Sequence, residues 1–379
     1  MQRVFFALPA ILTLSVMSSC HARLLLSREQ VDAWLAPLGA DDHFNAGKTV
    51  DWGLLPGPFY TPELGPGIGI ALAGIYRPTP GDRVSQNSTL SLSGYVSATG
   101  ATGINVSNYA FFAEDRWRFF LDGSVSNTPT YYRGQGFSAA EHDSRKQKYT
   151  AQGLSLRPVL YRQITTHTWL GVGGALDMQH AAGTGGGNRL IESTPQGVSV
   201  FSSGVSLDLT RDTRDFAPNP RTGQLADLHY TRYTPETGSD TRFEEYTLHY
   251  SHYRPLSERS VLAWELYGDF TQGDVPWSSL PLLGDSHRMR GYYEGRYRDK
   301  NVVSGQMEFR HRLSWRHGVV GWMGAGTMAP SFHMLSHSRW LPSVGVGYRF
   351  EFKPRMNVRL DYGIGKGSSG FYFQVGEAF

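Results

Sequence analysis

Residues 370–379 read Gly370-Phe371-Tyr372-Phe373-Gln374-Val375-Gly376-Glu377-Ala378-Phe379. The alternation is that of a β-strand, one face of which carries four apolar residues: Phe371, Phe373, Val375 and Phe379. In a soluble domain, a strand this apolar at an unprotected edge would invite aggregation. In a bilayer the strand is stable once a closed barrel pairs its edge. The stretch therefore predicts an all-β fold, a membrane-spanning antiparallel β-barrel.

The N-terminus has the three parts of a secretory signal peptide. Arg3 is basic, residues 4–16 form an apolar run, and a small-residue exit leads to Ala22, after which we expect cleavage. The only cysteine, Cys20, stands where a lipoprotein signal would carry one, but Met17-Ser18-Ser19 lacks the usual leucine-led lipobox, so lipidation stays an alternative. Export with such a signal predicts the outer membrane of a Gram-negative bacterium.

Composition agrees with an outer-membrane barrel. The chain has 379 residues, 13% aromatic residues and 44 glycines. Beyond the signal, no stretch approaches the roughly 18 apolar residues of a transmembrane helix. A secreted soluble β-protein would share this composition and remains the alternative. The net charge of +3 gives no case for nucleic acid as a partner.

The clearest strand pattern is Trp340–Lys353. One face carries apolar and aromatic residues that suit acyl chains: Trp340, Pro342, Val344, Val346, Tyr348, Phe350 and Phe352. The other face includes Arg349, Glu351 and Lys353, which suit a hydrated lumen.

Fifteen segments share this alternation: Ile68–Arg77, Thr89–Ala98, Ile104–Ala113, Arg116–Ser126, Tyr149–Arg162, Thr168–Met178, Gly197–Thr210, Gln224–Tyr233, Phe243–Arg254, Val261–Thr271, Val302–Leu313, Val319–Met328, Trp340–Lys353, Asn357–Gly365 and Gly370–Phe379. Single-chain bacterial barrels have an even number of strands, so we expect 16. The missing strand should lie in Val50–Tyr60 or Thr128–Gly136.

The predicted organisation has three parts. Residues 1–22 are the signal peptide, residues 23–66 a short periplasmic segment, and residues 67–379 the barrel. Ser27 can cap a helix that runs to about Leu38 within the periplasmic segment.

The longest connection between predicted strands holds the most specific signal. It reads Leu282-Leu283-Gly284-Asp285-Ser286-His287-Arg288-Met289-Arg290-Gly291-Tyr292-Tyr293-Glu294-Gly295-Arg296-Tyr297-Arg298-Asp299-Lys300. A loop in water needs no such density of arginine and tyrosine. A loop folded back into a polar lumen does, because a guanidinium can fork onto carboxylates that project from the wall.

This loop resembles that of the Omp85 superfamily, the BamA/TamA-like or surface antigen D15 type of barrel. The family signature is an Arg-Gly-Tyr/Phe tip on the sixth external loop, which Arg290, Gly291 and Tyr292 match. Further motifs follow in family order: Asp212–Asp215, Ser343–Arg349, Val358–Tyr362 and the final Phe379. The resemblance implies an outer-membrane barrel that inserts or translocates proteins or lipids.

Two departures from the family pattern matter. The family usually carries periplasmic POTRA modules, for which residues 23–66 are too few, so we expect a barrel without them and a periplasmic partner supplied separately. Gly324 stands where the family often has an aspartate that holds the loop arginine. Strand parity directs three other acids into the lumen as partners of Arg290, in order of preference Asp361, Glu308 and Glu351. Alternatively, Arg359 or Arg310 simply neutralises these acids within the wall.

The sequence gives no case for an enzyme, a cofactor or a metal site. Gly284-Asp285-Ser286 with His287 superficially resembles an esterase block, but adjacent loop residues do not supply a nucleophile, a base and an orienting acid. The histidines lack metal-ligand spacing, and we expect three of them to be ordinary wall residues: His229, His249 and His252.

The family resemblance implies a seam between the first and last strands that opens toward lipid or a client strand. Here these would be Ile68–Arg77 and Gly370–Phe379, with Glu377 at the periplasmic rim. The expected partners are the outer-membrane lipid bilayer and client outer-membrane proteins or lipids. The alternative function is a passive pore or a structural barrel without assembly activity.

Overall fold

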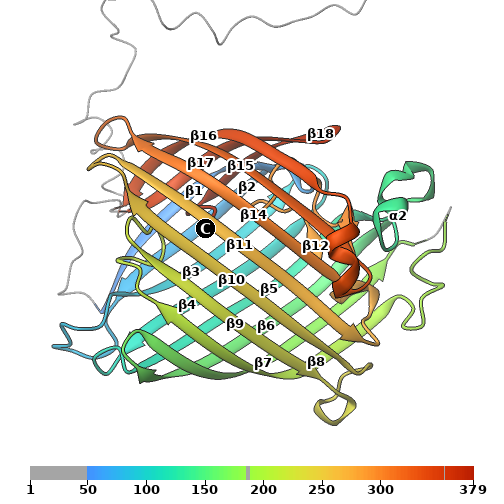
Figure 1. Cartoon of the computed structure of the whole chain (residues 1–379), viewed down its shortest axis with the longest axis horizontal. Helices are drawn as coiled ribbons and strands as arrows, with labels where there is room; N and C mark the ends of the chain where they lie inside the picture. The colour runs from blue at the N-terminus through green and yellow to red at the C-terminus, as the bar shows by residue number, and fades with distance from the viewer. Residues whose placement is uncertain (1–48, 185–187, 354) are drawn as a thin grey trace, which may run out of the picture.

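Sixteen antiparallel strands close into a barrel in the computed structural model, which describes residues 49–184, 188–353 and 355–379 (Figure 1). The barrel strands are β1 (Val50–Thr61), β2 (Gly65–Tyr76), β3 (Ser88–Ser97), β4 (Thr102–Phe112), β5 (Trp117–Tyr132), β6 (Gln147–Thr165), β7 (Thr168–Ala182), β8 (Ser199–Asp212), β9 (Gly223–Tyr233), β10 (Phe243–Pro255), β11 (Ser260–Gly273), β14 (Asn301–Arg312), β15 (His317–Ala329), β16 (Leu341–Lys353), β17 (Met356–Gly365) and β18 (Ser368–Val375). Each pairs with its neighbours in sequence, β11 pairs with β14, and β1 pairs with β18 to close the barrel. The predicted barrel of 16 strands is confirmed.

The remaining elements are short and lie in the connections. β12 (Leu282–Leu283) and β13 (Tyr297–Arg298) pair with each other. The helical segments are α2 (Phe137–Glu141), η2 (Asp143–Arg145), η3 (Pro235–Thr237), η4 (Trp277–Ser279) and η5 (Phe332–His337). Among the described residues, no helix has the length and apolar character needed to cross a membrane.

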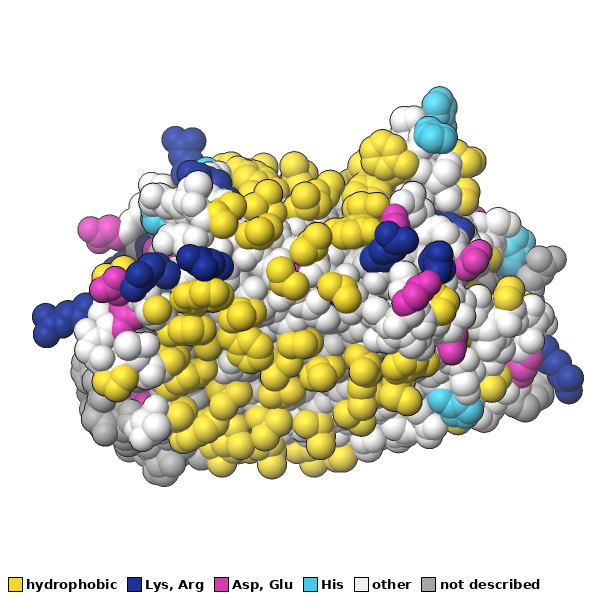
Figure 2. All heavy atoms as spheres, turned by 90° about the horizontal axis from the view of Figure 1, so that it is seen from below, with side chains coloured by type: hydrophobic (Ala, Val, Ile, Leu, Met, Phe, Trp, Pro, Cys, Tyr) yellow, Lys and Arg dark blue, Asp and Glu magenta, His cyan; other side chains and the backbone are white. Residues whose placement is uncertain are grey.

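The two faces of the wall meet different surroundings. On β8, Val205, Leu207 and Leu209 are exposed on the outer surface, whereas the alternating positions 206, 208 and 210 are polar and buried inside. The same alternation around the barrel produces a broad apolar band on the outer face (Figure 2). This is the pattern of a barrel with lipid outside and a polar lumen.

The first strand begins and the last strand ends at the same end of the barrel. Because the strands alternate in direction and are even in number, β1 begins where β18 ends, and we call this the terminal end. The opposite end, which we call the loop end, carries α2 and the long connection between β11 and β14 (Figure 1, right).

The strand that the alternation pattern missed is β1, one of the two segments in which we expected it. The barrel therefore begins at Val50 rather than at residue 67, and the predicted segment 23–66 contributes a wall strand. The other segment, Thr128–Gly136, in part extends β5 to Tyr132. The predicted signal peptide and the helix from Ser27 lie outside the described residues.

The barrel closes between β1 and β18, so β1 replaces Ile68–Arg77 as the first strand of the seam. A single residue pair, Tyr60 and Phe373, joins β1 to β18 in register. By contrast, β1 and β2 pair along all 12 residues of β1. The outward rings of Tyr60 and Phe371 also meet, with centroids 6.0 Å apart. The seam is therefore the weakest junction in the hydrogen-bonded wall.

The last four residues leave the wall, contrary to the prediction for Phe379. Gly376, at φ +93°, turns the chain inward after β18. The Phe379 ring lies against buried Tyr253, with centroids 6.2 Å apart, and its carbonyl accepts a hydrogen bond from Arg310 Nη2 at 2.7 Å. Phe371 and Val375 are exposed on the outer face. Phe379 instead faces the lumen, because the glycine turn ends the strand alternation.

Candidate functional site: the loop inside the barrel

The connection between β11 and β14 enters the barrel. At its neck, β12 and β13 pair Leu283 with Tyr297. Its tip is fully enclosed, since Met289 is 2% exposed and Tyr292 0%. The loop, the wall and helix α2 share one buried apolar cluster: Ala140, Leu283, Met289, Tyr292, Tyr297, Val302, Met328 and Leu341. The loop tip therefore packs against the inner face of the wall.

Arg290 is the centre of the site and is completely buried. Its Nη1 donates to Asp361 Oδ2 and its Nη2 to Glu308 Oε2, each at 2.6 Å. The guanidinium carbon lies 3.6 Å from the ring centroid of Trp322, so one face of the fork is covered by an aromatic ring. The Arg290 carbonyl accepts a hydrogen bond from Ser343 Oγ at 2.6 Å. Arg290 thus joins the loop to four strands, β14, β15, β16 and β17.

Gly291 allows the tip to touch the wall. Its φ of +108° disfavours any side chain, and a Cβ there would lie 2.8 Å from the backbone nitrogen of Gly365. Gly363 is matched to it, since a Cβ on Gly363 would lie 2.6 Å from the Arg290 carbonyl carbon. Gly291 N donates to Tyr372 Oη at 2.8 Å, and Gly291 O accepts from Ser368 Oγ at 2.7 Å. Both contacts reach β18.

Tyr292 completes the tip. Its hydroxyl donates to Pro342 O at 2.6 Å and accepts from Lys366 N at 2.7 Å, so it holds both β16 and the turn that follows β17. The ring lies on Gly365, where a Cβ would come within 2.5 Å of it. The three residues of the predicted motif therefore act on the same patch of wall.

Asp285 shapes the turn that leads into the tip. Its Oδ1 accepts the backbone N–H groups of His287 and Arg288, the latter at 2.6 Å. His287 Nδ1 lies 3.1 Å from Ser286 Oγ and 4.0 Å from Asp285 Oδ1. The carboxylate is committed to backbone donors, as in an ordinary Asx turn. The segment that resembled an esterase block thus has a local structural role.

The structure brings two of the three predicted acids to Arg290. Asp361 and Glu308 bind it together, and both are fully buried. Glu351 lies far from Arg290: on β16 it is eight residues beyond Ser343, which contacts Arg290, or about 26 Å along the strand. Its backbone N–H bonds to Arg316 near the terminal end. Strand parity sets which face of the wall Glu351 lies on, but not its position along the barrel axis, and that position is too far from Arg290.

Wall arginines also bind these two acids. Arg310 Nε donates to Glu308 at 2.8 Å, and Arg359 Nη1 to Asp361 at 3.0 Å. The loop arginine and the wall arginines therefore share the same two carboxylates.

Sequence reasoning missed the acid nearest the chain's end. Glu377 follows β18 at the terminal end, but its side chain turns inward: it is 2% exposed and accepts from Arg349 Nε at 2.8 Å. Arg349 Nη1 also donates to Asp361 at 2.6 Å. Because Arg310 holds the carbonyl of Phe379, hydrogen bonds and ion pairs link the loop tip to the chain's end by two routes. The signal that could have revealed this was Gly376, whose turn carries Glu377 inward.

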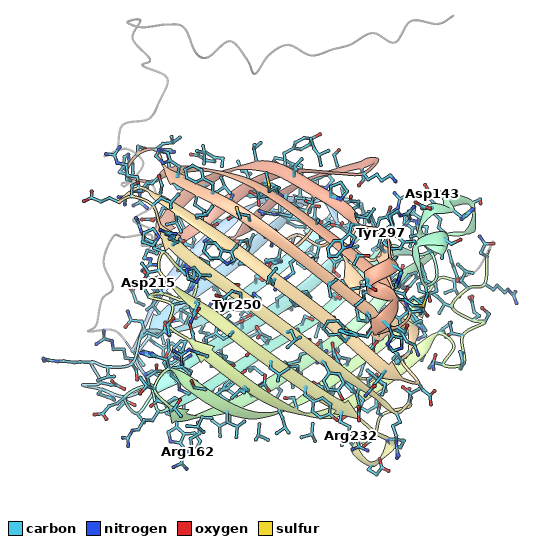
Figure 3. The ribbon with its side chains drawn as sticks, in the orientation of Figure 1. Asp143, Arg162, Asp215, Arg232, Tyr250 and Tyr297 are labelled. Carbon is cyan, nitrogen blue, oxygen red and sulfur yellow. The ribbon has the colours of Figure 1, made fainter. Side chains whose placement is uncertain are left out.

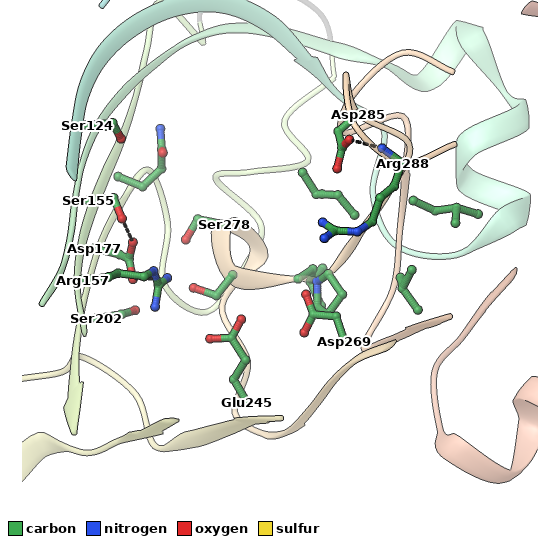
Figure 4. A pocket seen from close by; sticks show the side chains of 18 of the residues that line it. Ser124, Ser155, Arg157, Asp177, Ser202, Glu245, Asp269, Ser278, Asp285 and Arg288 are labelled. Carbon is green, nitrogen blue, oxygen red and sulfur yellow. Dashed lines mark hydrogen bonds and ion pairs between the residues drawn. The ribbon is translucent and has the colours of Figure 1, made fainter. Parts of the chain in front are cut away.

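Two cavities lie beside the loop inside the barrel. The first, about 340 Å³, lies between the loop and the wall from β5 to β11 and carries Arg157 paired with Asp177 at 2.8 Å (Figure 4). The second, about 850 Å³, is lined by the loop and by strands on both sides of the seam, β1 to β7 and β16 to β18. The larger cavity thus borders the seam.

A pair of acids joins the loop to the first hairpin beside the second cavity. Glu294 N donates to Glu63 Oε1 at 2.7 Å, and Glu63 lies in the turn between β1 and β2. Desolvation inside the barrel, reinforced by the charges of Asp285 and Glu63, raises the pKa of Glu294 to about 8. Burial likewise raises the pKa of Glu63. An ionised Glu294 would therefore place a second negative charge beside Glu63.

No cluster of three or more histidine, cysteine, aspartate or glutamate side chains suited to a metal ion occurs in the described part of the chain. His229 lies in the wall, where its Nδ1 meets Asp208 at 2.6 Å and its Nε2 meets Thr231 at 2.8 Å.

Comparison with known proteins decides the family. The Omp85 superfamily domain matches residues 81–379, which is most of the chain. The chain belongs to the Omp85 superfamily. Members of the Omp85 superfamily are outer-membrane β-barrels of Gram-negative bacteria. No curated protein sequence matches this Omp85 chain.

Solved structures give the same fold for this Omp85 barrel. BamA from Haemophilus ducreyi lacking POTRA domains 1-3 is similar with a TM-score of 0.54 at 14% identity, over 86% of this chain and 69% of that one. CdiB from Escherichia coli gives 0.58 at 14% identity, over 87% and 63%. CdiB from Acinetobacter baumannii gives 0.55 at 11% identity, over 87% and 60%. This chain thus spans less than two thirds of either CdiB.

Proposed function

We propose that this Omp85 barrel inserts or translocates proteins or lipids at the outer membrane, by lateral opening of the seam between β1 and β18. The single observation that carries the proposal is the placement of the loop tip across that seam. On one side Gly291 bonds to Tyr372 and Ser368 of β18. On the other, Glu294 bonds to Glu63 beside β1.

The seam is weak in the wall and is supported from inside. One residue pair connects β1 to β18, whereas eight connect β17 to β18. Opening would therefore break few hydrogen bonds between strands, and the loop contacts would supply much of the resistance. In this proposal Arg290 locks the loop, and the locked loop holds the seam closed.

The proposed clients are outer-membrane proteins or lipids that enter between the separated strands. An edge strand offers unpaired N–H and C=O groups, and a client strand can satisfy them. The cavity of about 850 Å³ beside the seam offers room on the lumen side. A periplasmic partner supplied by another chain would deliver the client. The chemistry is binding and release, without a catalytic residue.

A disulfide across the seam tests the opening directly. Tyr60→Cys with Phe373→Cys would place two thiols at the paired position of β1 and β18. The matched control is Leu54→Cys with Leu72→Cys, a paired position of β1 and β2 in the continuous wall. Oxidation of the seam pair should abolish delivery of other barrels or lipids to the surface, restored by a reductant, and oxidation of the control should not. Full delivery through the oxidised seam would refute lateral opening.

Planar-bilayer conductance separates this proposal from a passive pore. Deletion of residues 282–298 removes the plug, and removal of residues 331–338, which include η5, is the matched control at the same end. A passive pore would conduct with the loop in place and leave delivery intact in a null strain. The assembly proposal expects low conductance before the deletion, high conductance after it, and a delivery defect in the null strain.

A further inference from the structure

Three arginines lie on the outer surface near the terminal end, on alternate strands of the wall. They are Arg162 on β6, Arg211 on β8 and Arg254 on β10, and all three are exposed. Each shares strand parity with outward leucines of the apolar band: Leu160, Leu209 and Leu248. Two strand spacings, about 10 Å, separate the strands of neighbouring arginines. Along the strands, Arg211 lies two residues beyond the position level with Arg162, and Arg254 lies four residues beyond the position level with Arg211. The three positions form an arc at the edge of the band, which we call the arginine arc.

The arginines of the arc carry no counter-charge. Among the described residues, no ion pair joins Arg162, Arg211 or Arg254 to a carboxylate. At the loop end the pattern is reversed: Arg242 pairs with Glu236 at 2.6 Å, and Arg339 pairs with Glu141 at 2.8 Å. There, Arg232 of β9 also lies directly opposite Glu244 of β10.

Figure 3 labels Arg162 and Arg232 at opposite ends of the barrel. In Figure 2, basic side chains border the left-hand edge of the apolar band, at the terminal end. Within the described residues, the three arc arginines therefore lack the carboxylate partner that Arg242 and Arg339 have at the loop end and that Arg116, near the terminal end, has in Glu114 at 3.7 Å.

Aromatic rings flank the arginine arc at the depth of a membrane interface. The Arg162 guanidinium lies 5.3 Å from the ring centroid of Trp117, which is opposite it on β5. Beyond Arg254, the Trp264 ring stacks on His252 at 4.4 Å. Tryptophan at the ends of the apolar band marks the boundary between acyl chains and headgroups. The arc thus lies where lipid phosphates lie.

We propose that the arginine arc binds the phosphate groups of anionic phospholipids, of the phosphatidylglycerol class, in the leaflet at the terminal end. A guanidinium presents two parallel donors to phosphate oxygens, and acyl chains of the same lipid would cover the adjacent leucines. The unpaired arginines favour a lipid with net negative charge over a zwitterionic one, whose ammonium group would oppose them. This surface is distinct from the seam and does not depend on insertion activity.

Lipid titration of the detergent-solubilised protein, read by native mass spectrometry, tests the proposal. The probes are phosphatidylglycerol and phosphatidylcholine with the same acyl chains. For R162Q/R211Q/R254Q, the apparent Kd for phosphatidylglycerol should rise about tenfold or more, since each basic residue at an anionic surface contributes several-fold at low salt. The matched control, R232Q/R242Q/R339Q, should bind phosphatidylglycerol like the unaltered protein, and phosphatidylcholine binding should not change.

Equal binding of the two lipids by the unaltered protein would overturn the proposal, as would equal losses in the two triple variants. Inorganic phosphate at the lipid concentration should not compete, and full competition would reassign the arc to free phosphate. If the arc triple variant does not fold, two other measurements test the proposal. R211Q alone should weaken phosphatidylglycerol binding severalfold. In the unaltered protein, about 0.5 M salt should abolish the preference for phosphatidylglycerol over phosphatidylcholine. A preference that survives both would exclude the arc as its source.

Discussion

Replacement of Arg290 by alanine is the sharpest test of how the loop is held. The substitution removes both 2.6 Å hydrogen bonds to carboxylates and the contact with Trp322, at a position with no exposure to solvent. We expect the loop to leave its site on the wall more readily while the barrel strands keep their register.

The structure limits the size of the effect. Breaking an isolated buried ion pair costs about 3–5 kcal/mol, because one charge is left buried without a partner. Here Glu308 keeps Arg310 at 2.8 Å, and Asp361 keeps Arg349 at 2.6 Å. The free energy that docks the loop should therefore fall by the lower limit of this range, about 3 kcal/mol, which is roughly a hundredfold change in the docking equilibrium.

Two measurements follow this loss: urea unfolding in detergent, read by heat-modifiable gel migration, and trypsin cleavage within the loop. Arg288→Ala is the matched control two residues away, because Arg288 binds one carboxylate, Glu265, at 2.9 Å and its side chain is 24% exposed. We expect this control to lose about 1 kcal/mol of docking free energy. Arg290→Lys should retain part of the stability, since an ammonium does not reproduce the planar fork.

The reasoning fails if Arg290→Ala unfolds at the same urea concentration as the unaltered protein and its loop resists trypsin equally. Double-mutant cycles with Asp361→Asn and Glu308→Gln then apportion the interaction between the two acids. The structure predicts a measurable coupling energy with each, and coupling with neither would remove the proposed lock.

Three further predictions concern the surroundings of Arg290. Gly291→Ala forces a Cβ to within 2.8 Å of Gly365 N at a φ of +108°, so it should cost about 2 kcal/mol or more of unfolding free energy, whereas Gly367→Ala, with open space around it, should cost less. Glu377→Gln removes the charge that faces Arg349 at 2.8 Å and should lower unfolding stability by about 2 kcal/mol, with faster carboxypeptidase release of the final residues as the second readout. The pKa of Glu294 is raised from 4.5 to about 8, so loop docking should be strongest below pH 4.5 and weaken as pH rises through 8. Glu294→Gln should abolish this trend in trypsin resistance, and an unchanged trend would show that another group causes it.

Strand alternation in the sequence was enough to predict the barrel, since each wall residue faces either lipid or lumen and the two environments select opposite side chains. The strand that alternation missed, β1, contains Leu54-Leu55-Pro56-Gly57-Pro58, in which proline and glycine obscure the period of two. Even parity of the strand count nevertheless required it. The loop was predicted to enter the lumen because its arginines need carboxylates that water does not supply.

Only the tertiary structure decided which groups meet inside the barrel. Arg290 and Asp361 are 71 positions apart, and their contact depends on the height at which β17 passes the loop tip. Sequence period fixes the face of each residue, but height follows from strand register and tilt, which closure of all sixteen strands sets together. For the same reason Glu351 and Glu308 share a face but not a partner. The sequence of this protein thus determined which residues face lipid and which face the lumen, and closure of the barrel determined which lumen residues meet Arg290.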